Sequence, residues 1–134
     1  MRDITYIRKR FFDGKYAISD HAIMEARKDG IEPNTVEKLE WVALNGEIIE
    51  EYTDRDRILI YAKLVEPDLP VHIIVDYSFL EEPVIVTSYV PDSRYWIKDK
   101  IRKKLQRWLH GFVKKKEMSR MQRRNAAKIN QPAL

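Results

Sequence analysis

The stretch EIIEEYTDRDRILIYAKLVEPDLPVHIIVDYSFLEEPVIVTSYV, Glu47 to Val90, decides the fold. It holds four runs rich in Val, Ile, Tyr and Thr, at residues 47–53, 57–66, 71–78 and 84–90. The turn-forming sequences TDRD, PDLP and LEEP separate these runs. Short runs of this composition with such connections are typical of β-strands joined by tight turns. The stretch therefore predicts a four-stranded antiparallel sheet.

Two helical patterns precede the strands. Ser19 suits the N-cap of a helix and Gly30 its C-terminal end, because a serine side chain accepts from free N–H groups and glycine adopts the left-handed conformation. Pro33 suits the first turn of a second helix, which Gly46 stops. These signals predict an N-terminal helical pair, and residues 3–12 are a further short candidate.

A third helical pattern follows Pro91. Apolar residues recur there at three- and four-residue spacing, with basic residues between them, which is typical of a long amphipathic helix. The expected fold class is therefore α+β, with the helical pair, the four-stranded antiparallel sheet and a long basic C-terminal helix. The expected organisation is an α+β domain over residues 1–96, the helix over 97–117 and a basic tail over 118–134. The apolar stripe of the helix is Ile97, Ile101, Leu105, Trp108, Leu109 and Phe112.

Length and composition limit the class of protein. A chain of 134 residues with 44% hydrophobic content has material for one core. It lacks cysteine, which fits a cytoplasmic location. Apolar runs such as residues 71–75 fall far below the roughly 20 residues that span a bilayer, so we expect no membrane insertion. The three histidines follow no metal-ligand spacing, and we expect no metal and no cofactor.

The charges are strongly segregated along the chain. Residues 97–134 hold 13 lysines and arginines and two acidic residues, whereas residues 1–96 hold 12 basic and 19 acidic residues. Clustered lysines and arginines bind a phosphate backbone by releasing its counterions. The basic end therefore indicates a polyanionic partner, and RNA is the leading candidate.

The strand pattern also predicts which residues share a face. If the connection after Ser78 is symmetric, His72 lies opposite Tyr89, Ile74 opposite Thr87 and Asp76 opposite Ile85. The alternate residues, among them Val71, Ile73 and Val75, then form the core face. The face with His72 and Tyr89 is mixed in polarity, and the neighbouring strand contributes Tyr61 and Lys63 to it.

A polar face of this composition suits a metal-independent ribonuclease. Such an enzyme needs a base for the 2′-hydroxyl, an acid for the 5′-oxygen and cations for the charge on phosphorus, and histidine suits the first two roles. A structural interpretation remains open, because half-exposed faces of antiparallel sheets normally carry histidine and tyrosine. His21, near the start of a helix, is likewise either a catalytic group or a residue that packs the helix on the sheet.

Several motifs together resemble one small prokaryotic family. They are SDHAIMEARKDGI from Ser19, ALNGEIIEEYTD from Ala43, PVHIIV from Pro70 and TSYVPDSRYW from Thr87. Their order and spacing are similar to domain of unknown function 4258. The resemblance covers about residues 18–96. It implies the RelE and barnase-like toxin fold and a toxin-like endoribonuclease with RNA as its substrate.

The resemblance also implies site residues. The histidine of the family's helix falls on His21, the histidine of its strand on His72 and its tyrosine on Tyr89. The family usually has an arginine directly before its Gly-Ile pair, and this chain has Asp29 there. Other cations must then supply the charge, and the candidates are Arg27, Lys63 and Arg94.

The basic residues have three interpretations. In the first, the apolar stripe of the C-terminal helix packs on the sheet and the basic side chains point outward into solvent. In the second they bind the backbone of RNA, and in the third the helix serves a non-catalytic domain that binds nucleic acid, an acidic antitoxin-like protein or an anionic membrane surface. The predicted catalytic set is His21, His72, Tyr89 and Arg27. The predicted RNA-binding set is Lys63, Arg94, Lys98, Arg102, Lys103, Lys104 and Arg107.

Overall fold

The computed structural model describes residues 4–102. The chain divides into two compact units, Met1–Val90 and Pro91–Leu134, which we describe separately. Within the described residues no helix is long and apolar enough to cross a bilayer.

Three helices form in the first unit. They are α1 (Ile4–Phe12), α2 (Asp20–Lys28) and α3 (Thr35–Asn45). The predicted N-cap is confirmed, since the Ser19 Oγ accepts from the Ala22 N–H at 3.0 Å. Gly30 follows α2 with a φ of +90°, the left-handed conformation that favours glycine after a helix. The short candidate helix over residues 3–12 is α1.

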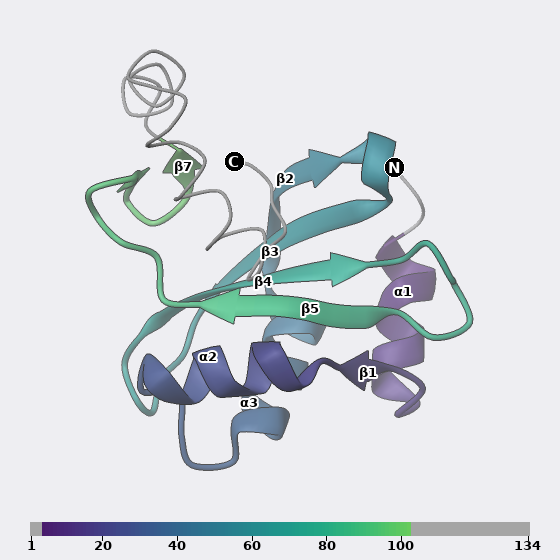
Figure 1. Ribbon diagram of the computed structural model, residues 1–134, viewed down its shortest axis with the longest axis horizontal. Helices are drawn as coiled ribbons and strands as arrows, with labels where there is room; N and C mark the ends of the chain where they lie inside the picture. The colour runs from purple at the N-terminus through teal and green to yellow at the C-terminus, as the bar shows by residue number, and fades with distance from the viewer. Residues whose placement is uncertain (1–3, 103–134) are drawn as a thin grey trace. The chain divides into compact units, whose positions relative to one another are not determined.

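The sheet of this unit has five strands in the order β1-β5-β4-β3-β2 (Figure 1). The strands β2 (Glu47–Tyr52), β3 (Arg57–Lys63), β4 (Pro70–Asp76) and β5 (Val84–Tyr89) are antiparallel neighbours, and a 3-10 turn, Thr53–Arg55, joins the first two. The fifth strand, β1 (Ala17–Ile18), pairs with β5 in parallel. The prediction of a four-stranded antiparallel sheet is therefore wrong. A two-residue strand carries no periodicity, so the sequence pattern did not reveal it.

Helix α2 continues the line of β1 along the remaining length of β5 (Figure 1). The Ser19 Oγ donates to the Val86 carbonyl oxygen at 3.1 Å, and the Ser88 Oγ donates to the Ala22 carbonyl oxygen at 2.7 Å. The Val90 N–H donates to the Asp29 Oδ2 at 2.9 Å. These hydrogen bonds tie α2 to β5 beyond the end of β1, where the described residues provide no further strand.

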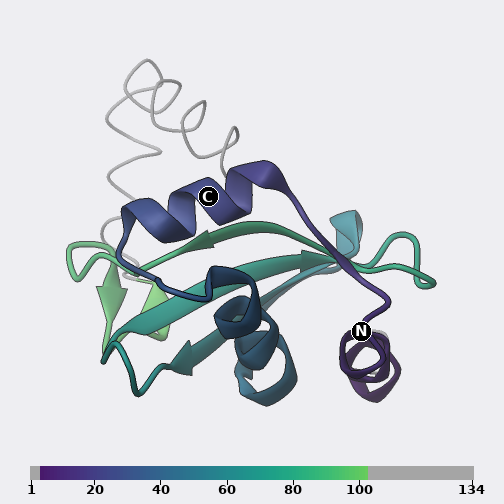
Figure 2. The ribbon, with the colours of Figure 1, turned by 90° about the horizontal axis from the view of Figure 1, so that it is seen from below.

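One face of the sheet packs against the helices. Figure 2 shows α1 and α3 on the same side of the sheet, with α2 along the β5 edge. The predicted core residues Val71, Ile73 and Val75 lie on this helix-covered face and are fully buried. Aliphatic side chains dominate its core, which also includes Ile7, Phe11, Ala22, Ala26, Leu39, Val42, Ile58, Ile60 and Ile85.

Close packing joins α3 to the sheet at Gly46. A Cβ at this position would lie 2.5 Å from the Ile60 Cγ2 and 2.7 Å from the Tyr61 carbonyl oxygen. The guanidinium of Arg8 on α1 donates to the carbonyl oxygens of Ala43 and Gly46 at the end of α3. The two hydrogen bonds from Arg8 thus satisfy carbonyl groups at the end of α3 that have no partner within the helix.

The register of β4 and β5 matches the predicted one for two of three pairs. His72 lies opposite Tyr89 and Ile74 opposite Thr87, as the symmetric connection predicts. The third pair is wrong, because Asp76 lies opposite Val84 and Val75 opposite Ile85. A bulge between these pairs shifts the register by one residue, which turns Ile85 to the helix-covered face.

In the second unit, the start of the predicted long helix is wrong. Residues 96–102 form a small hairpin of β6 (Trp96–Ile97) and β7 (Ile101–Arg102) instead. Lys98 and Asp99 have positive φ and reverse the chain. Ile97 and Ile101 lie directly opposite each other across the hairpin, so a spacing of four suits a hairpin as well as a helix. The remaining part, residues 103–117, and the tail, 118–134, lie outside the described residues.

Candidate functional site

The second face of the sheet carries the candidate site. Tyr61 of β3, His72 of β4, and Thr87 and Tyr89 of β5 lie on it, and we call it the polar face. His72 is 0% exposed and Thr87 is 1% exposed, whereas the two tyrosines are partly exposed. Two apolar residues of the same face, Leu59 and Ile74, are also buried. The polar groups at the centre of this face are therefore largely shielded from water.

His72 lies between two tyrosines. Its Nδ1 is 3.2 Å from the Tyr89 hydroxyl oxygen, which is within hydrogen-bond distance. Both tyrosine rings meet the imidazole edge to face, with ring centroids 5.2 Å away for Tyr89 and 5.9 Å for Tyr61. The cross-strand pairs of His72 with both tyrosines fix this arrangement. The hydrogen bond couples a buried imidazole to a phenol that solvent reaches.

An ion pair closes one end of the polar face. The Arg57 Nε donates to the Asp76 Oδ2 at 2.9 Å, and the Ser78 Oγ and N–H donate to the Asp76 Oδ1. Burial alone would raise the pKa of the Asp76 carboxyl. The hydrogen bonds from Ser78 and Arg57, with the charge of Arg57, outweigh burial and hold that pKa below its ordinary value.

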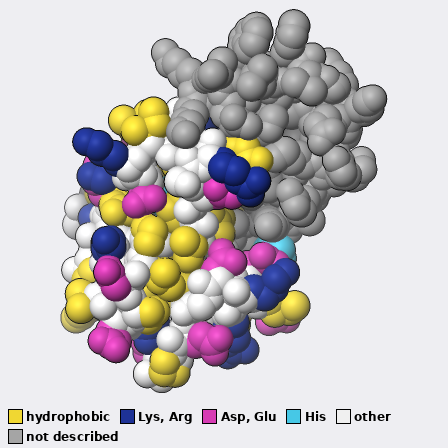
Figure 3. Space-filling model, turned by 90° about the vertical axis from the view of Figure 1, so that its left-hand side faces the viewer, with side chains coloured by type: hydrophobic (Ala, Val, Ile, Leu, Met, Phe, Trp, Pro, Cys, Tyr) yellow, Lys and Arg dark blue, Asp and Glu magenta, His cyan; other side chains and the backbone are white. Residues whose placement is uncertain are grey.

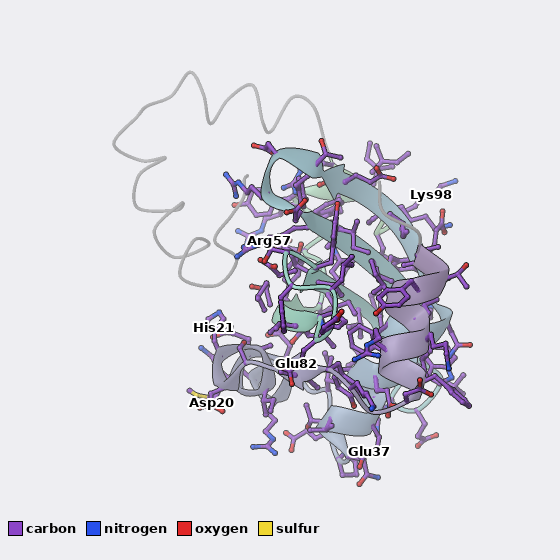
Figure 4. The ribbon with its side chains drawn as sticks, turned by 90° about the vertical axis from the view of Figure 1, so that its right-hand side faces the viewer. Asp20, His21, Glu37, Arg57, Glu82 and Lys98 are labelled. Atoms are coloured by element: carbon purple, nitrogen blue, oxygen red, sulfur yellow. The ribbon has the colours of Figure 1, made fainter. Side chains whose placement is uncertain are left out.

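His21 lies in the first turn of α2. Its Nε2 is buried and has no hydrogen-bond partner among the described residues, although the residue as a whole is partly exposed. In Figure 4 it points to the side of the sheet away from α1, where Arg57 also lies. Figure 3 shows one histidine side chain at the surface of the molecule, next to acidic and basic side chains. The imidazole therefore has one buried edge and one edge that solvent reaches.

The predicted phosphate-binding cations are only partly available. The Lys63 Nζ is 3.4 Å from the Asp68 Oδ1, and the Arg94 guanidinium pairs with Asp92, whose charge and hydrogen bonds raise the pKa of Arg94. Arg27 is exposed and lies six residues after His21, which places it on a different side of α2. The structure does not bring Arg27 to the histidines.

The remaining predicted RNA-binding residues divide into two groups. Lys98 is exposed at the turn of the hairpin, and the Arg102 guanidinium lies over the Trp96 ring at 4.5 Å from its centroid. Lys103, Lys104 and Arg107 lie outside the described residues.

Asp29, where the resemblance expects an arginine, has a structural role. Its carboxylate accepts from the Val90 N–H and thereby satisfies a backbone group at the open edge of β5. An arginine side chain has no acceptor for this bond.

Sequence reasoning missed Thr87. Its hydroxyl is buried on the polar face without a hydrogen-bond partner among the described residues. The predicted register placed Thr87 opposite Ile74, on the face of His72, and strand alternation was therefore the signal available. Within residues 4–102 no cluster of three or more His, Asp or Glu side chains could hold a metal ion.

Comparisons with family models, curated proteins and solved structures find no match. The resemblance noted from the motifs stays a prediction, and the geometry of the polar face carries the functional argument.

Proposed function

We propose that this protein is a toxin-like, metal-independent endoribonuclease that acts on RNA in the cytoplasm. The hydrogen bond between His72 and Tyr89 on the polar face carries the proposal. It links an imidazole, whose ring nitrogens can donate and accept hydrogen bonds, to a phenol that is partly exposed. Proton transfer by such a pair is the chemistry that RNA cleavage without a metal requires.

The burial of the two side chains assigns their roles. His72 is fully buried, whereas Tyr89 is partly exposed, so the Tyr89 hydroxyl is the group that meets RNA. In the proposed step the 2′-hydroxyl releases its proton to water as its oxygen attacks phosphorus. The bond from phosphorus to the 5′-oxygen breaks, and Tyr89 gives its proton to that oxygen, so that the proton released to water balances the one that Tyr89 must regain. Tyr89 then recovers a proton by way of His72. The products are a 2′,3′-cyclic phosphate and a 5′-hydroxyl.

The segregation of charge supports RNA as the partner. The 13 lysines and arginines of residues 97–134 attract a phosphate backbone, and they also suit an acidic antitoxin-like protein. Because the first 96 residues are net acidic, the basic end supplies most of the attraction in this proposal.

A second candidate function is RNA binding without cleavage. The observation in its favour is that Lys63 and Arg94 already pair with Asp68 and Asp92, which lowers their capacity to stabilise charge on phosphorus. In that case the basic end binds the backbone and the polar face is structural.

The test is cleavage of a mixed RNA pool in EDTA by the full chain and by Tyr89→Phe. The matched control is Tyr6→Phe, which removes a phenol hydroxyl from α1. We expect cuts with 2′,3′-cyclic phosphate ends from the wild type and from Tyr6→Phe, and few from Tyr89→Phe. Equal cleavage by all three proteins refutes the role of Tyr89. Salt-sensitive binding with no cleavage by any of them supports the second candidate.

A further inference from the structure

Two buried polar atoms of the described structure lack hydrogen-bond partners, the His21 Nε2 and the Thr87 Oγ1. A buried polar group without a partner costs about 1–3 kcal/mol, and such groups are rare in folded proteins. A bound ligand that hydrogen-bonds to these atoms would remove this cost.

The hydrogen bonds between α2 and β5 place His21 of α2 beside the part of β5 that contains Thr87. Ser19 is bonded to Val86 and Ala22 to Ser88, at 3.1 Å and 2.7 Å. His21 lies between Ser19 and Ala22, and Thr87 lies between Val86 and Ser88. The two unpartnered atoms therefore belong to the same short stretch where α2 runs beside β5.

This stretch adjoins the proposed catalytic pair. Thr87 and Tyr89 are two residues apart on β5 and share the polar face, which separates their Cα atoms by about 6.6 Å. His21 points to the side of the sheet on which Arg57 of the polar face lies (Figure 4). The partly exposed ring of His21 offers a ligand a path to this place from solvent.

We propose that the His21 Nε2 and the Thr87 Oγ1 together bind the 2′-hydroxyl of a ribonucleotide and so distinguish RNA from DNA. The inference rests on the proposed function, because it names the part of RNA that this side of the site recognises. A neutral imidazole nitrogen accepts one hydrogen bond, and the threonine hydroxyl donates one. A single ribose hydroxyl donates and accepts at once, so it satisfies both atoms.

This contact would favour ribonucleotides over 2′-deoxyribonucleotides. A site built to hydrogen-bond a hydroxyl rejects the analogue that lacks it, because its buried polar groups then stay unpaired. A 2′-deoxyribonucleotide leaves the His21 Nε2 and the Thr87 Oγ1 as they are in the free protein. We expect the full chain to bind ribonucleotides about tenfold more tightly than deoxyribonucleotides.

The experiment titrates the full chain with the four nucleoside 3′-monophosphates, their 2′-deoxy counterparts and inorganic phosphate. It follows affinity by calorimetry and the His21 ring by NMR. The variant Thr87→Val removes the unpartnered hydroxyl. The matched control Thr35→Val removes a buried hydroxyl whose Oγ1 donates to the Ile31 carbonyl oxygen at 2.9 Å. None of these ligands can be cleaved, so the result is independent of ribonuclease activity.

Three results are expected. The ribose preference falls toward one in Thr87→Val and persists in Thr35→Val. Thr87→Val leaves the melting temperature unchanged or raises it, because an unpartnered polar group is replaced by a methyl group. Thr35→Val lowers it by about 4–8 °C, because a satisfied hydrogen bond is lost.

Equal affinity for both sugars, or no nucleotide binding, overturns the inference. It is also overturned if phosphate alone shifts the His21 ring as much as the ribonucleotides do, or if Thr87→Val destabilises the protein as Thr35→Val does. Cleavage of RNA without ribose preference removes this inference and leaves the proposed function standing. Ribose preference without cleavage of RNA refutes the proposed ribonuclease function and leaves the binding of the 2′-hydroxyl by His21 and Thr87 standing.

Discussion

The two faces of the sheet are buried to a similar extent at their centres, but one carries aliphatic side chains and the other carries polar ones. On the helix-covered face, Ile73 and Val75 are fully buried among aliphatic side chains. On the polar face, His72 and Thr87 are as deeply buried. The His72 imidazole is hydrogen-bonded to Tyr89, but the Thr87 hydroxyl has no partner among the described residues, and burial of an unpartnered polar group costs free energy. The apolar face packs the helices onto the sheet, whereas the polar face is where the proposed function places its proton transfer.

The largest effect is expected from His72→Leu. Loss of the imidazole removes the hydrogen bond to Tyr89, and we expect the rate of RNA cleavage to fall by about 10²–10⁴-fold. The free energy of unfolding should change by less than about 1 kcal/mol, because leucine fills the buried space. The measurements are cleavage in EDTA and urea denaturation. Equal cleavage, or unfolding of the variant, would break the distinction between the faces.

Ile73→Ala provides the opposite case, on the helix-covered face. The substitution opens a cavity in a fully buried aliphatic cluster and should lower the free energy of unfolding by about 2–5 kcal/mol. The folded fraction should cleave RNA at the wild-type rate. Urea denaturation checks the loss, with Val65→Ala as the control, since Val65 is 83% exposed. A loss below about 1 kcal/mol would mean that this face does not dominate stability.

Much of the sheet could be predicted from the sequence. The alternation of apolar residues predicted the four antiparallel strands and two of three cross-strand pairs between β4 and β5. The bulge next to Val75 was not predictable, because a register shift of one residue leaves the composition of a strand unchanged. Strand β1 was missed because Ala17 and Ile18 are too few to show a period.

The C-terminal pattern failed for a different reason. A spacing of four between Ile97 and Ile101 places two side chains together in a helix and also across a tight hairpin. Lys98 and Asp99 have positive φ at the turn of the hairpin, and neither residue type requires that conformation, so the turn left no signal in the sequence.

The candidate site was predictable where it depends on strand register. Counting along β4 and β5 placed His72 opposite Tyr89, which the structure confirms. The roles of the cations were not predictable, since ion pairs such as Lys63 with Asp68 depend on how loops fold. Thr87 was missed because an unpartnered hydroxyl is a property of packing, which no single residue type signals.

Substitutions of Asp29 test the hydrogen bond at the β5 edge of the sheet, between the helix-covered face and the polar face. Asp29→Ala removes the acceptor for the Val90 N–H and should lower the free energy of unfolding by about 1–2 kcal/mol. Asp29→Arg, the residue that the resemblance expects, should have a similar cost. Thermal or urea unfolding gives the comparison. The control Asp68→Ala, which breaks an exposed ion pair, should cost less than about 1 kcal/mol. No difference between Asp29 and Asp68 would show that the edge bond is unimportant.

The smallest effect is expected at the end of the polar face, where Asp76 pairs with Arg57. Asp76→Asn keeps the shape and removes the charge, and we expect it to lower the free energy of unfolding at pH 7 by about 0.5–1 kcal/mol. Because the pKa of Asp76 is lower in the folded protein than its ordinary value of 3.8, the folded state binds fewer protons than the unfolded state.

The difference between the two proteins should therefore be complete above about pH 3.8 and vanish as the pH falls through the lowered pKa. Urea denaturation of the wild type and Asp76→Asn between pH 7 and pH 2 measures it. A difference that does not decrease as the pH falls below 3.8 would mean that Asp76 acts through shape rather than charge. The Asp76 and Arg57 ion pair lies at the end of the polar face, and the hydrogen-bonded pair of His72 and Tyr89 lies further along it. A small charge effect at Asp76 beside a large catalytic effect at His72 would therefore locate the chemistry of the polar face in proton transfer.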